Sequence, residues 1–315
     1  MNTVTRNTLL MAALLVGLVV WWLFNRPRQT TLDPRETTLA VHDTAAIGQV
    51  RLLRFSHKKE SSRLVLERTA AGWRVNGQYD ARPDKVELLL TALRRLAVRE
   101  PLHPNARPTV FGYLDENHIR VEVDGPEPRT FFVGEQAAVG QGSYLLVQGA
   151  ASPVIAHLPG MTPYLKPYFS TFVNDWRDNR IFALNPREIY RLEVDAGPLG
   201  RFAIDQRPGS VALAGIPQAD TARLHRYLER YRSVPARGFG AREYPTVRDS
   251  LARRPPDASI ALRDRQGYVR RLVLYNRQDD VNTRFGWVEG EDELLIVQHF
   301  ALDSLLVPPT WFLGR

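Results

Sequence analysis

Apolar residues alternate with polar ones in several short runs of the chain, and a period of two predicts β-strands. In the first half these runs lie near residues 50–55, 64–66, 73–75, 119–123, 130–133, 144–147 and 154–156. After the third run the period becomes that of a helix. A helix over residues 85–98, preceded by Asp84, is predicted by the apolar positions Val86, Leu89, Leu90, Leu93 and Leu96. Its apolar side needs a partner, and we expect it to pack on one face of the sheet.

The same pattern returns in the second half at a constant offset. Residues 63–67, Arg-Leu-Val-Leu-Glu, return 138 residues later as residues 201–205, Arg-Phe-Ala-Ile-Asp, and the helical stripe returns as Leu224, Tyr227, Leu228, Tyr231 and Val234. Later strands return at an offset of 141, which an insertion in the loop after the helix explains. The sequence therefore predicts an α+β fold with two tandem duplicated modules. Each is a mainly antiparallel sheet with one long helix packed on a face.

The repeat sets the expected domain boundaries. We place module 1 over residues 47–168 and module 2 over residues 185–315, and a length of 315 residues agrees with two domains of roughly 100 to 200 residues each. Residues 32–46 are polar and form the expected tether. Residues 169–184 form the expected connector, which is too aromatic for a flexible linker, so we expect it to pack between the modules.

An uncharged apolar run at residues 8–24 lies within an amino-terminal anchor region, residues 1–31. At about 1.5 Å per residue, this run nearly crosses a hydrocarbon core of about 30 Å. Trp21 and Trp22 stand where interfacial aromatic residues are found. A cleaved signal peptide fits less well because no small-residue cleavage site follows, and a buried soluble helix would need a polar face that the run lacks. We therefore predict a single, uncleaved transmembrane helix.

Composition excludes several classes of site. The chain has no cysteine, which excludes disulfides, thiolate metal ligands and a cysteine nucleophile. The net charge of +8 is partly due to Arg6, Arg26 and Arg28 near the anchor, and the remaining charges of both signs are mixed along the chain. A mixed, mildly basic surface is not typical of a nucleic-acid-binding protein, so no nucleic-acid partner is expected.

Four features could carry chemistry, and for each a structural role is the stronger interpretation. Trp73 and Trp287 could line a ligand groove, but their apolar neighbours in strands favour core packing. Residues 140–144 are glycine-rich but precede a strand, which favours a hairpin turn over a phosphate-binding loop. The acidic residues 289–293 lack the ligand spacing of a calcium loop, which favours a solvated hairpin tip. The seven histidines form no pair with metal-ligand spacing. We therefore predict no catalytic, cofactor or metal site and no enzymatic activity.

The remaining candidate is the run Asp175, Trp176, Arg177 and Asp178 in the connector. Arg177 stands between two carboxylates and could bind a partner. Alternatively, the run could fix the joint between the modules by ion pairs around a buried tryptophan, and we favour this second interpretation. The four residues are our candidates for a partner surface or an inter-module surface.

Several of these features, in this order, resemble a known family. They are the amino-terminal span, the Gly-Trp-Arg-Val-Asn-Gly strand and turn (residues 72–77), the helix that follows Asp84, the Gly-Ser-Tyr-Leu-Leu-Val strand (residues 142–147) and the Asp-Trp-Arg-Asp run. Together they resemble the bacterial family catalogued as domain of unknown function 4340 (DUF4340), best over residues 52–184, with a more diverged second copy. The resemblance implies a membrane-anchored extracytoplasmic protein, often encoded beside ABC-type export or gliding-motility components. It supplies no catalytic residues.

We therefore expect the chain in the inner membrane with its bulk on the periplasmic side, although the arginines that follow the span would by themselves favour the cytoplasm. The leading hypothesis is a non-catalytic accessory or scaffold protein that interacts with a membrane complex of ABC-transporter or gliding-motility type. The alternative is a module that binds envelope glycan or lipid in an aromatic groove, and an envelope hydrolase is a third hypothesis. Binding to sacculi or liposomes that depends on Trp176 would favour the glycan or lipid module.

Overall fold

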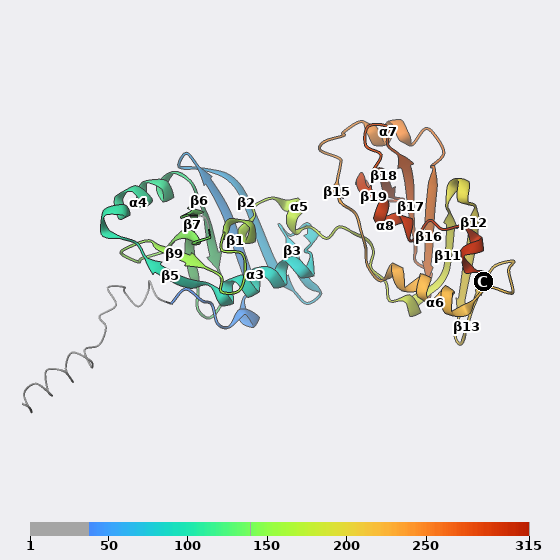
Figure 1. Cartoon of the computed structure of the whole chain (residues 1–315), viewed down its shortest axis with the longest axis horizontal. Coiled ribbons are helices and arrows are strands. Elements are labelled where there is room, and N and C mark those ends of the chain that lie inside the picture. The colour runs from blue at the N-terminus through green and yellow to red at the C-terminus, as the bar shows by residue number, and fades with distance from the viewer. Residues whose placement is uncertain (1–37, 139, 315) are drawn as a thin grey trace, which may run out of the picture. The chain divides into compact units, whose positions relative to one another are not determined.

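The computed structural model describes residues 38–138 and 140–314. Contacts divide the chain into two compact units. The first comprises the described residues up to Gln78 together with Asp84–Phe172, and the second comprises Tyr79–Pro83 and Val173–Arg315. Each unit is built on a large antiparallel sheet with few helices (Figure 1), so the fold is α+β.

The sheet of the first unit runs in the order β3-β2-β1-β6-β7-β8-β9-β5, and all these neighbours are antiparallel. Its strands are β1 (Gln49–Ser56), β2 (Lys59–Thr69), β3 (Gly72–Val75), β5 (Ala97–Pro101), β6 (His118–Val123), β7 (Arg129–Gln136), β8 (Ser143–Val147) and β9 (Val154–His157). The short strand β4 (Tyr79–Asp80) lies in the segment that groups with the second unit.

The long helix of the first unit, α3 (Pro83–Arg95), has the apolar face that its sequence predicts. Val86, Leu89 and Leu93 are buried, whereas Leu90 is only half-buried. The helix is shorter than the predicted range of 85–98. Residues Ala97–Pro101 instead form β5, an edge strand that pairs with β9. Pro101 could not have continued the helix, because proline has no backbone N–H.

A second helix of this unit, α4 (Arg107–Glu116), has no counterpart among the elements that the sequence predicts. It buries Val110 and Leu114. The 3-10 helices of this unit are η1 (Thr44–Ala46), η2 (Pro104–Ala106) and η3 (Lys166–Phe169).

The carboxyl end of α4 holds the hairpin between β1 and β2. His57 and Lys58 form the two-residue turn and both have positive φ angles, of 50° and 63°. Positive φ at both positions gives a turn whose twist matches that of the flanking strands. The Lys58 backbone N–H donates to the Glu116 carbonyl at 3.1 Å, and the Lys58 ammonium lies 2.6 Å from Asp115. These contacts fix the hairpin tip against the helix.

The sheet of the second unit runs in the order β13-β12-β11-β16-β17-β18-β19-β15. Its strands are β11 (Ile189–Asp195), β12 (Arg201–Arg207), β13 (Ser210–Leu213), β15 (Gly238–Phe239), β16 (Ala258–Asp264), β17 (Val269–Asn276), β18 (Thr283–Val288) and β19 (Leu295–Gln298). A separate pair consists of β10 (Arg180–Phe182) and β14 (Val234–Pro235).

The helix α6 (Thr221–Glu229) covers the core of the second unit. The Asp220 carboxylate accepts hydrogen bonds from the N–H groups of Ala222 and Arg223, at 2.8 and 3.2 Å, and thereby caps the helix start. Leu224, Tyr227 and Leu228 are buried in one cluster with residues of β11 to β13, residues of β16 to β19, and Phe312 near the carboxyl end. The remaining helices of this unit are α5 (Val173–Trp176), α7 (Val247–Leu251), α8 (His299–Asp303) and the 3-10 helices η4 (Pro186–Glu188), η5 (Gly197–Leu199), η6 (Arg230–Arg232) and η7 (Pro309–Phe312).

The predicted transmembrane helix at residues 8–24 lies outside the described residues. In the part of the chain that the structure describes, no helix has both the length and the apolar character needed to cross a bilayer.

Truncating one buried leucine of α3 should destabilise the first unit. Leu93 is fully buried and Leu88, on the same helix, is 36% exposed. Because Leu93→Ala leaves a cavity, we expect it to lower the free energy of unfolding by about 2–5 kcal/mol. Leu88→Ala is the matched control and should change it by less than about 0.5 kcal/mol. Denaturant titration of the full chain, followed by hydrogen exchange of the β1 and β6 amides, measures both. Equal effects would contradict the assigned face of α3.

Candidate functional site

The sheet of the first unit has two faces of different character. Leu52, Val121 and Phe131 are completely buried on the face that we call the inner face. The intervening side chains of the same strands point to the opposite, outer face. At one end of the outer face, α4 packs over a small apolar cluster made of Leu102, Val110, Leu114 and Ile155 with partly buried Ala106, Ala137, Tyr144 and Leu146.

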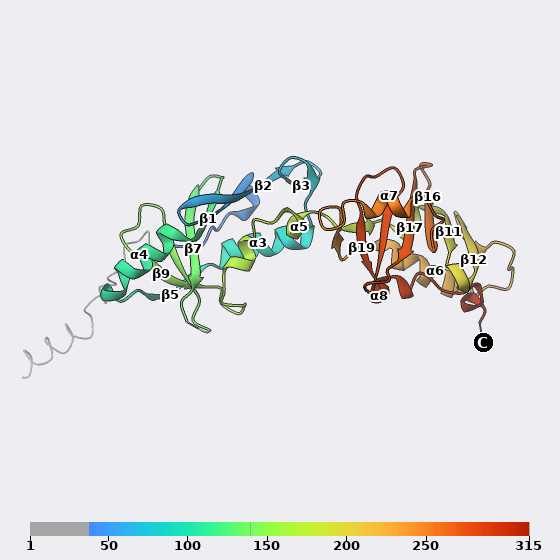
Figure 2. The same ribbon diagram turned by 90° about the horizontal axis from the view of Figure 1, so that it is seen from above.

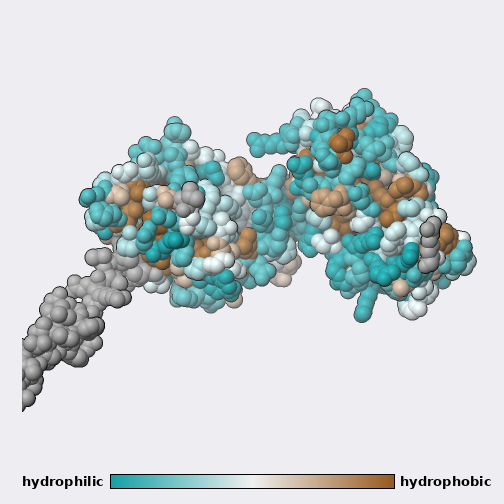
Figure 3. Space-filling view, viewed as in Figure 1, coloured by the Kyte–Doolittle hydropathy of each residue, from teal (hydrophilic) through white to brown (hydrophobic). Residues whose placement is uncertain are grey.

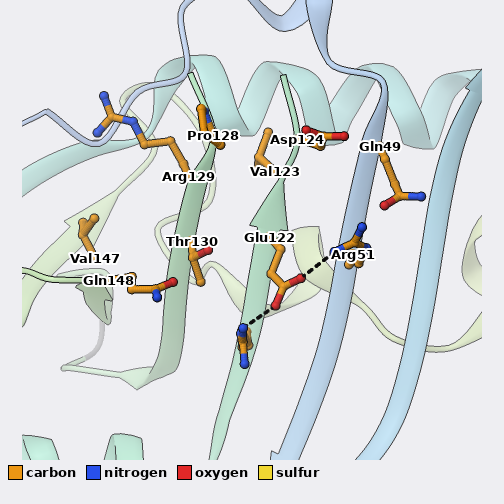
Figure 4. Close-up of a pocket in the computed structure, with 11 residues that line it drawn as sticks. Gln49, Arg51, Glu122, Val123, Asp124, Pro128, Arg129, Thr130, Val147 and Gln148 are labelled. Atoms are coloured by element: carbon orange, nitrogen blue, oxygen red, sulfur yellow. Dashed lines mark hydrogen bonds and ion pairs between the residues drawn. The ribbon is translucent and has the colours of Figure 1, made fainter. Parts of the chain in front are cut away.

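The other end of the outer face is open. Figure 4 shows Arg51, Glu122, Thr130 and Gln148 on one side of four neighbouring strands, β1, β6, β7 and β8. The strand register sets Arg51 opposite Glu122 and Glu122 opposite Thr130. These residues, together with Arg120, line a shallow hollow of about 750 Å³, which we call the first open half-face.

Two arginines share one carboxylate in this hollow. Arg51 Nη1 lies 3.2 Å from Glu122 Oε2, and Arg120 Nη2 lies 2.6 Å from Glu122 Oε1. All three side chains remain solvent-accessible, Arg51 most of all, with 52% exposed. The lining contains the three arginines Arg51, Arg120 and Arg129 and the two carboxylates Glu122 and Asp124. Arg129 also lies 4.0 Å from Glu127, so the positive charge that this hollow offers to solvent comes from Arg51 and Arg120, which share Glu122.

His118 separates the open half-face from the region under α4. Its ring stacks on Phe55 with 4.6 Å between centroids and meets the edge of Phe132 at 5.3 Å. Its Nδ1 lies 2.6 Å from the Leu114 carbonyl at the end of α4. Burial lowers the pKa of His118 below its usual 6.5, and Arg120 and Lys166 lower it further, while the Leu114 carbonyl and Asp115 act in the opposite direction.

The second unit has a hollow in the corresponding place. Val273, Tyr275, Phe285, Trp287 and Leu294 form an apolar cluster against α7. In Figure 2, α7 and α6 lie on opposite sides of this sheet. Beyond that cluster, a hollow of about 720 Å³ lies over β11, β12, β16 and β17, which we call the second open half-face. Its charged lining residues are Glu193, Asp195, Glu289, Arg201 and Arg271, so negative charge is in excess.

The predicted run at residues 175–178 lies in and after α5, within the second unit. Trp176 is 3% exposed, so it is not available to line a ligand groove. Asp175 is exposed, and Asp178 pairs with Arg180 at 2.5 Å. The Asp178 N–H donates to the Asp80 carbonyl at 2.8 Å, which joins the run to the segment 79–83 of the same unit.

Arg177 has the densest set of contacts in the run. Its guanidinium carbon lies 4.1 Å from the ring centroid of Tyr79 and 3.8 Å from that of Phe239. Its Nη1 donates to Glu293 Oε2 at 2.6 Å, and both side chains are about four-fifths buried, at 17% and 21% exposure. A guanidinium stacked on two rings and paired with a carboxylate is a stabilising arrangement.

The acidic loop between β18 and β19 joins two paired strands, and most of its carboxylates are exposed as its sequence predicts, Asp292 most of all and Glu293 least. Its four carboxylates pair with four different arginines, so they are spread apart. The pairs are Glu289 with Arg271 at 3.5 Å, Glu291 with Arg270 at 2.7 Å, Asp292 with Arg248 at 3.0 Å and Glu293 with Arg177 at 2.6 Å. Across residues 38–138 and 140–314, no three histidine, aspartate or glutamate side chains gather as a metal site would require.

The other sequence candidates have structural surroundings. Trp287 is 7% exposed and stacks on Tyr275, with 4.8 Å between ring centroids. Trp73 is half-buried, and the guanidinium carbon of Arg68 lies 4.8 Å from the centroid of its ring. Gly142 has a φ of 126°, and a Cβ there would lie 2.3 Å from the Ala156 carbonyl oxygen, so this glycine serves the turn into β8.

The face of the molecule drawn in Figure 3 is mostly hydrophilic, with small apolar patches. The most exposed large apolar side chains, such as Val281, Phe300 and Phe172, come from separate segments. None of these three apolar side chains lines an open half-face, and both half-faces carry several charged side chains instead. Sequence reasoning missed them because their residues come from strands far apart in the chain; the alternation Arg120-Val121-Glu122 is the only local signal.

Acid should destabilise the first unit through His118. Unfolded, this histidine binds a proton near pH 6.5, whereas the folded one does so only at lower pH. The stability of the first unit is therefore full above about pH 6.5 and decreases as the pH falls through the folded pKa. Thermal unfolding between pH 8 and pH 5, monitored by exchange of the β6 amides, should show this slope. His118→Phe should reduce the slope, leaving the part due to His157, whose pKa is also lowered. His225→Phe, on the exposed side of α6, is the control; an unchanged slope in His118→Phe would contradict the prediction.

Arg177 should stabilise the second unit through Glu293 and the two rings. We expect Arg177→Ala to lower the free energy of unfolding by about 1–3 kcal/mol and Arg177→Lys to recover only part, because an ammonium cannot stack on rings as a planar guanidinium does. A double-mutant cycle with Glu293→Gln should give a coupling of about 1 kcal/mol. The exposed pair Arg232 and Glu229 is the control and should couple by less than about 0.5 kcal/mol. No coupling for Arg177 would show that the ion pair contributes nothing.

Comparison with known proteins gives one family. The profile of the domain of unknown function DUF4340 matches residues 79–250, which is 172 of the 315 residues. The match lies further along the chain than the range of 52–184 over which the resemblance is expected to be best. No curated protein and no solved structure matches the chain. Since the family profile covers more than half of the sequence, the chain belongs to the DUF4340 family.

Proposed function

We propose that this protein is a non-catalytic accessory or scaffold protein, anchored in the inner membrane, that binds a partner protein of an ABC-type transport or gliding-motility complex. The observation that supports it best is the pair of open, charged half-faces on the two sheets. Each offers side chains from several neighbouring strands on a rigid support, and binding residues on strands are held more accurately than residues on loops.

The size and character of these surfaces favour a macromolecular partner. Both hollows are shallow, and each is lined by several charged side chains as well as apolar ones. Sites for small molecules are usually deeper and mostly apolar. A rigid, charged sheet face is better suited to a protein surface of complementary charge, which it recognises by electrostatic pairing.

We further propose that the two units arose by duplication. Their sheets have the same strand order from β3 to β5 and from β13 to β15. The pairs Phe131↔Val147 and Leu145↔Val154 have counterparts 141 residues later in Leu272↔Val288 and Gly286↔Leu295. Other strands have other offsets. Leu66 faces Val75 as Ile204 faces Leu213, an offset of 138 for β2 and β3, and Val121 faces Phe131 as Ile260 faces Leu272, an offset of 139 for β6. A duplicated unit gives one chain two surfaces for the same complex, and linked surfaces strengthen binding.

The anchor and the location belong to the same proposal. Residues 8–24 supply an apolar run of spanning length. The tether to the first unit is shorter than the predicted residues 32–46, because Leu39 and Val41 are already buried in that unit. The periplasmic side and the type of partner come from the family resemblance. The charged half-faces are compatible with this location, because a periplasmic surface remains in water.

Protease treatment of intact spheroplasts tests the location. If the two units are periplasmic, added protease should degrade them without detergent while a cytoplasmic control protein stays intact. Protection of the units until the membrane is dissolved would place them in the cytoplasm and contradict the proposal. Purification in mild detergent at native expression then tests the partner. Repeated recovery of the protein without any transport or motility component would contradict the scaffold role.

A further inference from the structure

The first open half-face contains more cationic donors than its own carboxylates use. Each guanidinium has five N–H donors, and Glu122 takes one close contact from Arg51 and one from Arg120. The Arg51 side chain is 52% exposed and that of Arg120 is 38% exposed. Both arginines can therefore bind a second anionic group from solvent without losing Glu122.

Neighbouring side chains extend this set of donors. Thr130 follows Glu122 in the same row across the sheet, and Gln148, directly after β8, donates its backbone N–H to the Thr130 carbonyl at 2.9 Å (Figure 4). A threonine hydroxyl and a glutamine amide can both donate to carboxylate oxygens. Arg129, at the start of β7, already has partners: its Nη1 donates to the Thr38 carbonyl at 2.8 Å and its Nη2 lies 4.0 Å from Glu127. Asp124 is the one opposing carboxylate besides Glu122 in the lining.

The carboxylates of the second open half-face are paired differently. Arg201 pairs with Asp195 at 2.8 Å, and Arg271 lies 3.5 Å from Glu289. Glu193 is the third carboxylate of the lining and pairs with Arg191 at 2.6 Å. Each of these carboxylates thus has its own arginine, whereas in the first open half-face Arg51 and Arg120 share Glu122. The second open half-face therefore attracts an anionic ligand less than the first.

We propose that the first open half-face binds an acidic segment of the partner protein, with Arg51 and Arg120 as its binding residues. This inference rests on the proposed scaffold function and specifies the chemistry of the partner. An extended segment places every second side chain on one side at a spacing of about 7 Å, which suits a surface built from parallel rows of strand residues. Its carboxylates form charge-assisted hydrogen bonds with the free guanidinium N–H groups.

The test uses the full chain in detergent and a short fluorescein-labelled peptide of alternating glutamate and threonine residues. Fluorescence anisotropy should show binding that weakens as salt is added, because the contacts are partly exposed ion pairs. The double variant Arg51→Gln/Arg120→Gln should weaken binding by about tenfold. Glu122→Gln should strengthen binding, because it removes the carboxylate that competes for the same arginines.

The matched control is Arg201→Gln/Arg271→Gln on the second open half-face, which removes the same number of charges. It should leave peptide binding unchanged within about twofold, apart from the general effect of net charge. Thermal unfolding shows that each variant remains folded, and because Glu122→Gln acts in the opposite direction, a gain of binding cannot result from unfolding. Equal losses in the two double variants, or no peptide binding by the wild type, would overturn the inference.

Two further results separate this inference from the proposed function. If a transport or motility complex co-purifies equally with wild type and with Arg51→Gln/Arg120→Gln, and the peptide does not depend on these arginines, the scaffold role stands and the acidic-segment inference fails. If the peptide depends on them but no complex co-purifies, the inference stands and the scaffold role fails. Arginine-dependent binding to phosphatidylglycerol vesicles without peptide binding would identify a lipid surface and also overturn the inference.

Discussion

Burial of one face of each sheet determines the rest of the structure. Residues such as Leu52 and Val121 in the first unit, and Leu192 and Ile260 in the second, are completely buried. Fully burying a side chain of this kind contributes about 1.5–3 kcal/mol, and a shift of the strand register by one residue would expose the whole set. The register is thus fixed by the inner face. The residues between the buried ones therefore point to the outer face, because successive side chains of a strand point to opposite faces of the sheet.

The two outer faces are then divided in the same way. A short helix, α4 or α7, covers the end where aromatic and aliphatic side chains gather. The other end is left to charged side chains, which pair across strands as Arg51 does with Glu122. An arginine also helps to stabilise the second unit, where the mostly buried guanidinium of Arg177 lies over two aromatic rings. Planar, strongly charged side chains thus stabilise the units and also form the surfaces that we propose for binding.

Features with a strong local period could be predicted from the sequence, and features that depend on the meeting of distant segments could not. The buried sides of α3 and α6 follow from regular helical spacing, as Val86 and Leu93 or Leu224 and Tyr227 show. The helix α4 buries only Val110 and Leu114, and Pro108 and Gly112 obscure its period. Residues 97 and 98 continue an apolar helical pattern, yet they pair with β9. The candidate site needed the register of β1 with β6, and the acidic loop needed the positions of four arginines scattered over the second unit.

The edge strands also limit unwanted association. A chain with two antiparallel sheets of the same strand order has several free edges, each of which could capture a neighbouring chain or exchange a strand with the other sheet. The edge next to β9 is a short strand, β5, that carries Arg99 and Glu100 and ends in Pro101, and the corresponding β15 has only two residues. Charge, proline and brevity leave little backbone for a foreign strand to pair with. Edges of this kind tolerate crowding of many copies without fibril-like stacking, and each copy keeps its own strands.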